Sequence, residues 1–370
     1  MGKSLNLLLL LIFFSFSILS CSNEIDPESL PSFAGINTDE NTVYFLTENG
    51  YNRADGSGEH ETGKICAIDT KTSKKIYTYQ FKRHIVKSLV YDPSFDINPY
   101  IILDQYSRIK EKVVKIDVKT GELKKINLDF DVDFFILGPL NIINNKLLIP
   151  NNYRDYLTDS YNEKCFVYDI KNGSSSYIDF PAGMLQNNKI SLNNNDYFYI
   201  QNYNKNGIYN FTTGTMLADN VFTQNYKSCF FYCNKYMFAL DNSTNTPNLF
   251  LIDSFEPDLV YTHLFTYNNS TNYSYVVYED NNYLYSIDNE IDSGEEEYIN
   301  EKVTIKKIDK QQNYDVVETK TLVGGWFKGY NVQSYYRNGY IWCLNGPIYY
   351  SSSTNIYRID TNDLSVRIID

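Results

Sequence analysis

Ile65-Cys66-Ala67-Ile68-Asp69 is the stretch of sequence that decides the fold, because the same pattern returns along the whole chain. Its form is two apolar residues three positions apart, followed at once by Asp and a short polar turn. Five further copies are Val113-Val114-Lys115-Ile116-Asp117, Cys165-Phe166-Val167-Tyr168-Asp169, Leu249-Phe250-Leu251-Ile252-Asp253, Ile305-Lys306-Lys307-Ile308-Asp309 and Ile356-Tyr357-Arg358-Ile359-Asp360. A seventh copy, Gly207-Ile208-Tyr209-Asn210-Phe211, lacks the Asp but keeps the turn Thr212-Thr213-Gly214.

The spacing of these copies predicts the architecture. Strand units that recur roughly every 40–50 residues are typical of β-propellers, whose blades are four-stranded sheets. A second apolar run, such as 43–46 or 340–343, precedes each copy and is short and rich in aromatic residues, which is typical of strands. Four strands, A to D, are expected at 33–37, 43–47, 64–68 and 75–81 in the first unit, and at 331–336, 340–344, 356–359 and 365–369 in the last. We therefore predict an all-β, seven-bladed β-propeller of four-stranded antiparallel blades over 32–370, with no strand exchange between its ends.

The Asp that ends each copy is interpreted as a turn residue. An Asp side chain accepts hydrogen bonds from backbone N–H groups two residues further on, and Gly supplies the positive φ that closes such a turn. A ring of cation-binding carboxylates is the alternative, and the local turn chemistry disfavours it.

The strand–Asp–turn–strand grammar resembles the bacterial propellers of the YVTN and PQQ-like repeat superfamily. The resemblance covers 32–370 and implies the fold. PQQ-type blades usually carry a docking Trp, whereas this chain has only Trp326 and Trp342. A quinone-cofactor enzyme is therefore not expected, and no cofactor is predicted.

The N-terminus predicts export and lipid attachment. Residues 1–20 combine Lys3 with an apolar stretch, which is typical of a signal peptide. The end of that stretch, Ile18-Leu19-Ser20-Cys21, resembles a bacterial lipobox, which implies cleavage before Cys21 and acylation of that residue. An uncleaved anchor helix or an ordinary signal peptide is the alternative. Residues 21–31 are expected to be the acylated Cys and a flexible tether, and 32–370 a single domain. The expected location is the outer membrane, facing the periplasm or the cell surface.

Composition narrows the partners. The net charge of −12 disfavours nucleic acid and anionic lipid surfaces as partners, because both need clustered Lys and Arg. Five further cysteines are mostly expected in strands as buried apolar residues. They form no Cys-x-x-Cys, and with three scattered His they predict no metal site. Acidic runs at 55–61 and 288–295 are interpreted as solvated loops. A monomer is expected.

Long connections between strands B and C indicate where ligands bind. Three large B–C loops are expected at 49–63, 151–164 and 288–302, whereas A–B and C–D connections are short. Function concentrates on loops carried by a rigid scaffold. Aromatic faces and Arg suit sugars, catecholates, peptide side chains or carboxylates. The predicted ligand-binding residues are Tyr106, Arg108, Tyr153, Arg154, Tyr203, Trp326, Phe327 and Tyr330.

These observations favour a non-enzymatic, lipid-anchored binding propeller that captures a small molecule, a glycan or a protein, and passes it to a membrane complex. No nucleophile elbow, metalloprotease motif or phosphate loop is found in the sequence. A glycan-active hydrolase or lyase is the first alternative, because propeller enzymes assemble carboxylate pairs from distant blades. An outer-membrane assembly scaffold, similar to the PQQ-type lipoprotein of the barrel-assembly machinery, is the second.

Overall fold

The computed structural model describes most of the predicted strands. Described are residues 39–48, 62–82, 84–92, 96–105, 108–126, 140–143, 145–155, 160–179, 186–192, 195–201, 206–210, 213–219, 226–232, 235–241, 246–255, 260–267, 271–290, 302–323, 332–345 and 355–369. Within these ranges the secondary structure is entirely β. The predicted signal peptide, Cys21, the tether and the first predicted strand at 33–37 lie outside the described residues.

The strands form six sheets, which we divide into seven sequential units that follow the sequence repeat. Unit 1 contains β1 (Thr42–Glu48), β2 (Thr62–Asp69) and β3 (Lys74–Lys82), and unit 2 contains β4 (His84–Asp92), β5 (Asp96–Gln105), β6 (Arg108–Ile116) and β7 (Leu123–Lys125). Unit 3 contains β8 (Asn141–Ile143), β9 (Lys146–Asp155), β10 (Ser160–Asp169) and β11 (Ser175–Asp179), and unit 4 contains β12 (Gln186–Leu192), β13 (Asn195–Gln201), β14 (Asn206–Asn210) and β15 (Thr215–Asp219).

The remaining strands complete the chain in the same way. Unit 5 contains β16 (Tyr226–Tyr232), β17 (Tyr236–Asp241), β18 (Pro247–Ser254) and β19 (Val260–Thr266). Unit 6 contains β20 (Thr271–Glu279), β21 (Tyr283–Glu290), β22 (Lys302–Asp309) and β23 (Asp315–Val323). Unit 7 contains β24 (Val332–Arg337), β25 (Tyr340–Asn345), β26 (Ile356–Asp360) and β27 (Val366–Ile369).

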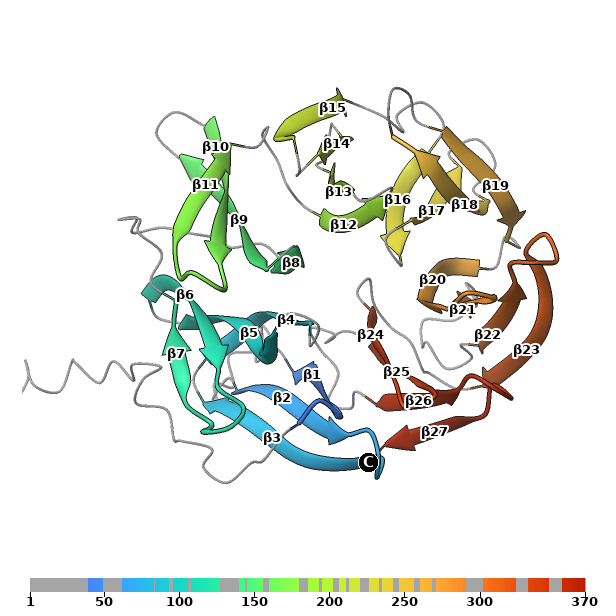
Figure 1. Cartoon of the computed structure of the whole chain (residues 1–370), viewed down its shortest axis with the longest axis horizontal. Helices are drawn as coiled ribbons and strands as arrows, with labels where there is room; N and C mark the ends of the chain where they lie inside the picture. The colour runs from blue at the N-terminus through green and yellow to red at the C-terminus, as the bar shows by residue number, and fades with distance from the viewer. Residues whose placement is uncertain are drawn as a thin grey trace, which may run out of the picture.

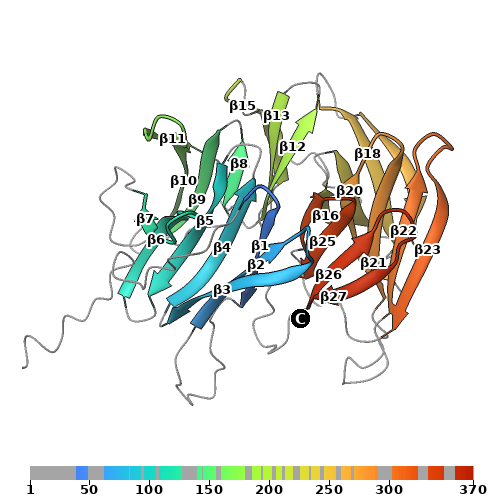
Figure 2. The same ribbon diagram turned by 60° about the horizontal axis from the view of Figure 1, so that its bottom comes forward.

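The sheets surround a common centre, as a propeller-like fold requires (Figure 1). Units 3 to 7 are each a four-stranded antiparallel sheet in sequence order. Units 1 and 2 are joined by one parallel pair, Thr62 with His84, and so form a single seven-stranded sheet. The turned view shows the strands running between two ends of the molecule (Figure 2). We call the end with the A–B and C–D connections the turn end, and the end with the B–C and D–A connections the loop end.

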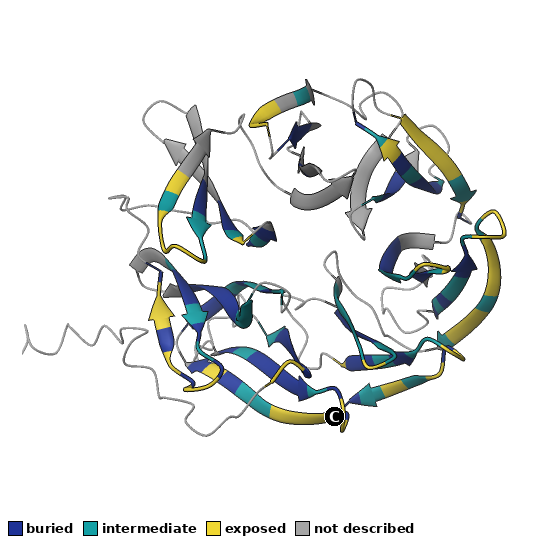
Figure 3. Cartoon of the chain, viewed as in Figure 1, coloured by how far each residue is buried: buried dark blue, intermediate teal, exposed yellow. Residues whose placement is uncertain are grey.

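Apolar side chains between neighbouring units form the core (Figure 3). One cluster joins units 1 and 2 through residues such as Tyr44 and Ile101, and another joins units 6 and 7 through Ile305 and Ile341. The middle strands of a unit are apolar on both faces because a neighbouring unit covers each face. Burial of one such aliphatic side chain contributes about 1.5–3 kcal/mol, so the packing between units provides most of the stability.

Units 1 and 7 pack against each other although they lie at opposite ends of the chain. Val43 and Phe45 share an apolar cluster with Trp342, and Arg358 donates a 2.6 Å hydrogen bond to Ser73. The side-chain amide of Gln333 accepts from the backbone N of Leu46 at 3.0 Å and donates to its carbonyl at 3.2 Å. Among the described strands none is exchanged between the two units. Contacts between side chains therefore join units 1 and 7, as an exchanged strand joins the first and last blades in other propellers.

The interpretation of the repeated Asp as a turn residue is confirmed. Oδ1 of Asp117 accepts from the backbone N of Lys119 at 3.0 Å and of Thr120 at 3.1 Å. Asp169 and Asp309 accept from the residues two and three positions further on in the same way. The two backbone hydrogen bonds to Asp117 lower the pKa of its carboxyl against the opposing effect of burial. The Asp therefore caps the C–D turns of units 1, 2, 3, 6 and 7. In unit 5, Asp253 accepts instead from Thr262 Oγ1 of β19 at 2.8 Å.

The seventh copy of the repeat is shifted by one residue from the predicted position. Asn210, not Phe211, ends the strand, and its Oδ1 accepts from the backbone N of Thr213 at 3.0 Å. The N of Gly214 donates to the carbonyl of Asn210, as the N of Gly121 donates to that of Asp117. Gly214 has a φ of +73°, which a side chain would disfavour. The unit has therefore kept the turn and replaced the carboxylate by an amide.

Candidate functional site

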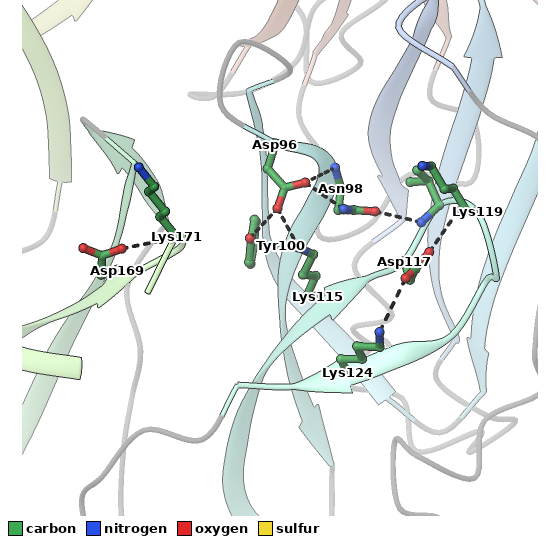
Figure 4. Close-up of polar contacts among 10 residues, drawn as sticks. Asp96, Asn98, Tyr100, Lys115, Asp117, Lys119, Lys124, Asp169 and Lys171 are labelled. Atoms are coloured by element: carbon green, nitrogen blue, oxygen red, sulfur yellow. Dashed lines mark hydrogen bonds and ion pairs between the residues drawn. The ribbon is translucent and has the colours of Figure 1, made fainter. Parts of the chain in front are cut away.

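At the turn end, networks of side chains join neighbouring strands, and the carboxylate oxygens in these networks all accept hydrogen bonds or form ion pairs. In unit 2, Oδ2 of Asp96 accepts from the Tyr100 hydroxyl at 2.8 Å and from Lys115 Nζ at 2.7 Å (Figure 4). Its Oδ1 accepts from the backbone and side chain of Asn98, whose own oxygen accepts from the N of Val118. Burial alone would raise the pKa of Asp96, but these hydrogen bonds lower it. The network ties the A–B connection to the C–D turn.

A similar network joins units 5 and 6 at the same end. Oε2 of Glu279 accepts from the Tyr236 hydroxyl at 2.8 Å and from Lys310 Nζ at 3.1 Å. Lys235 Nζ lies 3.3 Å from Oε1. Burial and the charge of Glu279 raise the pKa of Tyr236 well above its usual range. Tyr236 and Lys235 belong to unit 5, so the Glu279 cluster is a bridge that holds two units together.

The loop end differs from the prediction in one important respect. The expected loop at 151–164 is mostly a ribbon, because β9 and β10 pair without interruption out to Asp155 and Ser160. The expected loop at 288–302 begins later, since Asp288 to Glu290 still pair with β22. Polar residues form backbone hydrogen bonds between strands as well as apolar residues do. Because these stretches are polar, their sequence pattern did not predict strands.

The predicted ligand residues divide into two groups. Tyr153 and Arg154 lie in the β9 ribbon, opposite Asn162 and Tyr161, and not in a loop as expected. Arg108 is the first residue of β6 and pairs with Gln105. These three residues are placed by their backbone alone. The other five predicted residues are Tyr106, Tyr203, Trp326, Phe327 and Tyr330, and they lie outside the described residues, as does Cys21.

The sequence analysis did not identify a buried polar cluster toward the loop end of units 5 and 6. Asp288 on β21 is 2% exposed, although it was expected in a solvated loop. Oδ1 of Asp288 lies 2.6 Å from Ser274 Oγ, and its Oδ2 lies 2.5 Å from Lys306 Nζ. The Ser274 oxygen also lies 2.7 Å from the hydroxyl of Tyr267. We call Tyr267, Ser274, Asp288 and Lys306 the Asp288 cluster.

Aromatic rings flank the ammonium of this cluster. Lys306 Nζ lies 4.9 Å from the ring centroid of Tyr267 and 5.7 Å from that of Phe265. The Lys306 side chain is 23% exposed, whereas that of Asp288 is 3% exposed. Burial and the Asp288 charge raise the pKa of the Tyr267 phenol well above its usual range. The Lys306 ammonium is thus partly exposed, and it contacts the buried Asp288 carboxylate and the rings of Tyr267 and Phe265.

A buried hydroxyl extends the cluster inward. Ser286 lies on β21 two residues before Asp288 and opposite Lys306 in the strand pairing. Its Oγ is fully buried and has no hydrogen-bond partner among the described residues, although its effect on the pKa of Tyr267 places it near that phenol. Buried polar groups are normally paired, so a hydroxyl of this kind requires an explanation. Ser286 therefore belongs to the buried polar surroundings of the Tyr267 phenol.

One periodicity in the sequence, not used in the prediction, is consistent with this cluster. Leu284, Ser286 and Asp288 alternate with Tyr285 and Ile287, so a strand over all five residues places Ser286 and Asp288 on the face of a buried Leu. The contact with Lys306 depends on the register between β21 and β22, which the sequence does not show.

Two further findings concern metals and membranes. Within the described ranges, no three His, Cys, Asp or Glu side chains are grouped closely enough to hold a metal ion. The same part of the chain has no helix that is sufficiently long and apolar to cross a membrane. Cys66 and Cys343 are buried without a disulfide, as expected for small apolar residues, and burial raises the pKa of Cys66 to about 11.

Comparison with known proteins shows the fold. No protein-family model matches the sequence, and no curated protein matches it either. Solved structures do match. A protein from Lactobacillus plantarum is 9% identical with a TM-score of 0.53, over 89% of this chain and 95% of that one. A putative 6-phosphogluconolactonase from Bacteroides uniformis is 10% identical with a TM-score of 0.51, over 89% and 95%.

A third similar structure is an oligogalacturonate lyase in complex with manganese. It is 10% identical with a TM-score of 0.53, over 84% of this chain and 89% of that one. At such low identities these proteins share the fold with this chain, and the fold alone does not imply a common function. Together with the ring of antiparallel sheets, they establish a β-propeller-like fold.

Proposed function

We propose that this chain is a seven-bladed, lipid-anchored, non-enzymatic binding propeller, which captures a small molecule, a glycan or a protein at the outer membrane or the cell surface. Cys21 is the proposed lipid attachment site. The ligand site is assigned to the loop end, with the Asp288 cluster of units 5 and 6 as one of its walls. The predicted residues Arg108, Tyr153 and Arg154 contribute from units 2 and 3 in this proposal.

The observation that carries the proposal is the difference between the two ends of the molecule. At the turn end, carboxylates such as those of Asp96 and Glu279 each accept hydrogen bonds from several donors and so hold strands or units together. At the loop end, antiparallel pairing already joins the two strands that carry Asp288 and Lys306. Ser274 also links this pair to Tyr267 of unit 5, but the Lys306 ammonium stays partly exposed. Burying an ion pair usually stabilises a protein no more than apolar residues of the same size would. A role in binding is the better explanation for such a pair.

An enzyme is the second candidate, and the Asp288 cluster is the specific observation in its favour. A carboxylate, an ammonium and two hydroxyls in contact provide groups that can donate and accept protons. The similar structure of an oligogalacturonate lyase makes a glycan-active enzyme the form to test. The proposal keeps binding first, because Asp288 is almost fully covered and its two oxygens are occupied by Ser274 and Lys306.

The test compares a double variant with the unaltered chain. Asp288→Asn together with Lys306→Met removes both charges and keeps the approximate volume of the pair. We expect the melting temperature to change little, because a neutral replacement of a buried pair is tolerated. We expect loss of capture from arrays of neutral and acidic oligosaccharides and from detergent extracts of the native membrane fraction, read by mass spectrometry.

Lys310→Met is the matched control, because Lys310 contacts a carboxylate of the same unit at the turn end. It should lower stability and leave capture unchanged. If the double variant captures the same molecules as the unaltered chain, the ligand site is elsewhere. If oligosaccharides are shortened during incubation and the double variant abolishes that reaction, the enzyme candidate replaces the binding proposal.

A further inference from the structure

A set of exposed lysines occupies the turn end of units 1, 2 and 3. Each follows strand C or begins strand D, so all share the same level of the molecule. The set comprises Lys71, Lys74 and Lys75 of unit 1, Lys119, Lys124 and Lys125 of unit 2, and Lys171 of unit 3, and every one is exposed. We call it the basic rim. Figure 3 shows exposed stretches along β3 and β7, and Figure 4 shows Lys119, Lys124 and Lys171 beside their turns.

The acidic residues of the same segments are largely engaged in the turns. Asp69, Asp117 and Asp169 each accept backbone N–H hydrogen bonds from the residues that follow them. Asp117 also lies 3.5 Å from Lys124 Nζ, whose side chain remains 59% exposed. Where side-chain burial is described in these three segments, Glu122 is the one exposed acidic residue that caps no turn, and Asp39 and Glu40 are exposed at the A–B connection of unit 1. The outward charge of the basic rim is therefore positive, although the chain as a whole carries −12.

The corresponding segments of units 6 and 7 have the opposite character. Asp315 and Asp363 are exposed at these positions, and Glu318 is half-buried. Lys310 is engaged by Glu279 and by the carbonyl of Asp280. Lys320 and Arg367 are the exposed cations of these two segments. Exposed positive charge at the C–D segments is thus greater in units 1 to 3 than in units 6 and 7, a difference that the net charge of the whole chain does not reveal.

We propose that the basic rim binds the surface of a membrane that contains anionic phospholipids. All seven residues are lysines, which are flexible point charges, and the set contains none of the Arg forks that recognise one phosphate precisely. They are spread over three units, with Ile76 as the exposed apolar residue among them. Such a surface suits diffuse attraction to many headgroups, to which each Lys adds a modest amount. This inference does not depend on the proposed ligand site.

The rim would act together with the proposed anchor at Cys21. The anchor would hold the chain at the membrane, and a basic patch would add electrostatic attraction that orients the domain on an anionic surface. If both exist, the turn end of units 1 to 3 faces the bilayer and the opposite, loop end is presented away from it. The rim can nevertheless be tested without the anchor.

The experiment uses the full chain with Cys21→Ser, so that no acyl chain contributes. Its co-sedimentation is measured with vesicles of phosphatidylcholine alone and of phosphatidylcholine mixed with phosphatidylglycerol. Binding through residues 1–20 contributes equally with both kinds of vesicle. The difference in binding between the two kinds of vesicle therefore measures the electrostatic contribution. We expect tighter binding to the mixed vesicles, and Lys119→Gln with Lys171→Gln to weaken that binding about thirtyfold at low salt and much less at high salt.

Lys320→Gln with Arg367→Gln is the matched control, because it removes the same charge from units 6 and 7. It should reduce binding to mixed vesicles by much less than the rim variant does. Equal binding to the two kinds of vesicle overturns the proposal, and so does an equal loss in the rim and control variants. Should the rim variant melt at a lower temperature, Lys125→Gln alone repeats the test, with a smaller expected loss.

Discussion

Units 5 and 6 hold two carboxylate clusters at opposite ends of the same interface, and the two clusters are built differently. Glu279 lies at the turn end, bridges the units and accepts from Tyr236 and two lysines. Asp288 lies toward the loop end, is almost fully buried, and pairs with Lys306 of its own unit. The bridge stabilises the assembly of units. The Asp288–Lys306 pair also contacts Tyr267 of unit 5, but it leaves the Lys306 ammonium partly exposed, which is why we propose a role in binding for it.

The largest expected effect is that of Lys306→Met alone. It leaves the buried Asp288 carboxylate without its cation and should lower the free energy of unfolding by about 3–5 kcal/mol. Adding Asp288→Asn should restore most of that loss. Urea denaturation of the three proteins checks this. If the single and double variants are equally unstable, the comparison between the two clusters fails, because both would then be structural.

Glu279→Gln should have the next largest effect. The amide accepts fewer and weaker hydrogen bonds, and its NH₂ group faces Lys235 or Lys310, so a loss of about 2–3 kcal/mol is expected. The transition measured by fluorescence should also become less cooperative, because the bridge between units 5 and 6 is weakened. A loss below roughly 0.5 kcal/mol, typical of an exposed pair, would contradict the bridging role.

Asp96 predicts an acid-dependent loss of stability. Its pKa is lowered in the folded protein, chiefly because the hydrogen bonds from Lys115 and Tyr100 outweigh the effect of burial. The stabilisation is therefore complete above the unfolded pKa of about 4 and is lost as the pH falls through the lower folded value. Asp96→Asn should destabilise the protein at pH 7, and its difference from the unaltered chain should shrink on acidification. Melting temperatures measured from neutral to acid pH check the sign.

The smallest expected effect concerns the caps at the turn end. Asn210→Ala removes the acceptor for the N of Thr213 and should cost about 1 kcal/mol, as loss of a single neutral hydrogen bond does. Asp117→Ala removes two such bonds and should cost more. Thermal melts of the two variants measure the difference between their losses of stability. An equal loss would mean that the carboxylate and the amide are equivalent caps.

The sequence predicted the turn end more accurately than the loop end, for a physical reason. A cap such as Asp169 contacts its own next two residues, so local chemistry specifies it. The one-residue shift at Asn210 arose because Asn caps the same turn as Asp. The ribbon of β9 and β10 was missed because backbone hydrogen bonds stabilise polar strands without an apolar signal. The predicted ligand residues Tyr106, Tyr203, Trp326, Phe327 and Tyr330, together with the lipidation at Cys21, stay predictions.

By itself, the sequence determined an all-β chain of repeated strand units with caps at one end, because strand periodicity and turn chemistry act over a few neighbouring residues. Only the tertiary structure decided which charges meet. Asp288 and Lys306 are distant in sequence and come together through the register of β21 and β22. The lysines of the basic rim gather because three units place their C–D turns at one level. Strand registers and the residues that share a face are set by packing over the whole chain. The net charge of −12 is a sum over all residues and does not show local differences in surface charge.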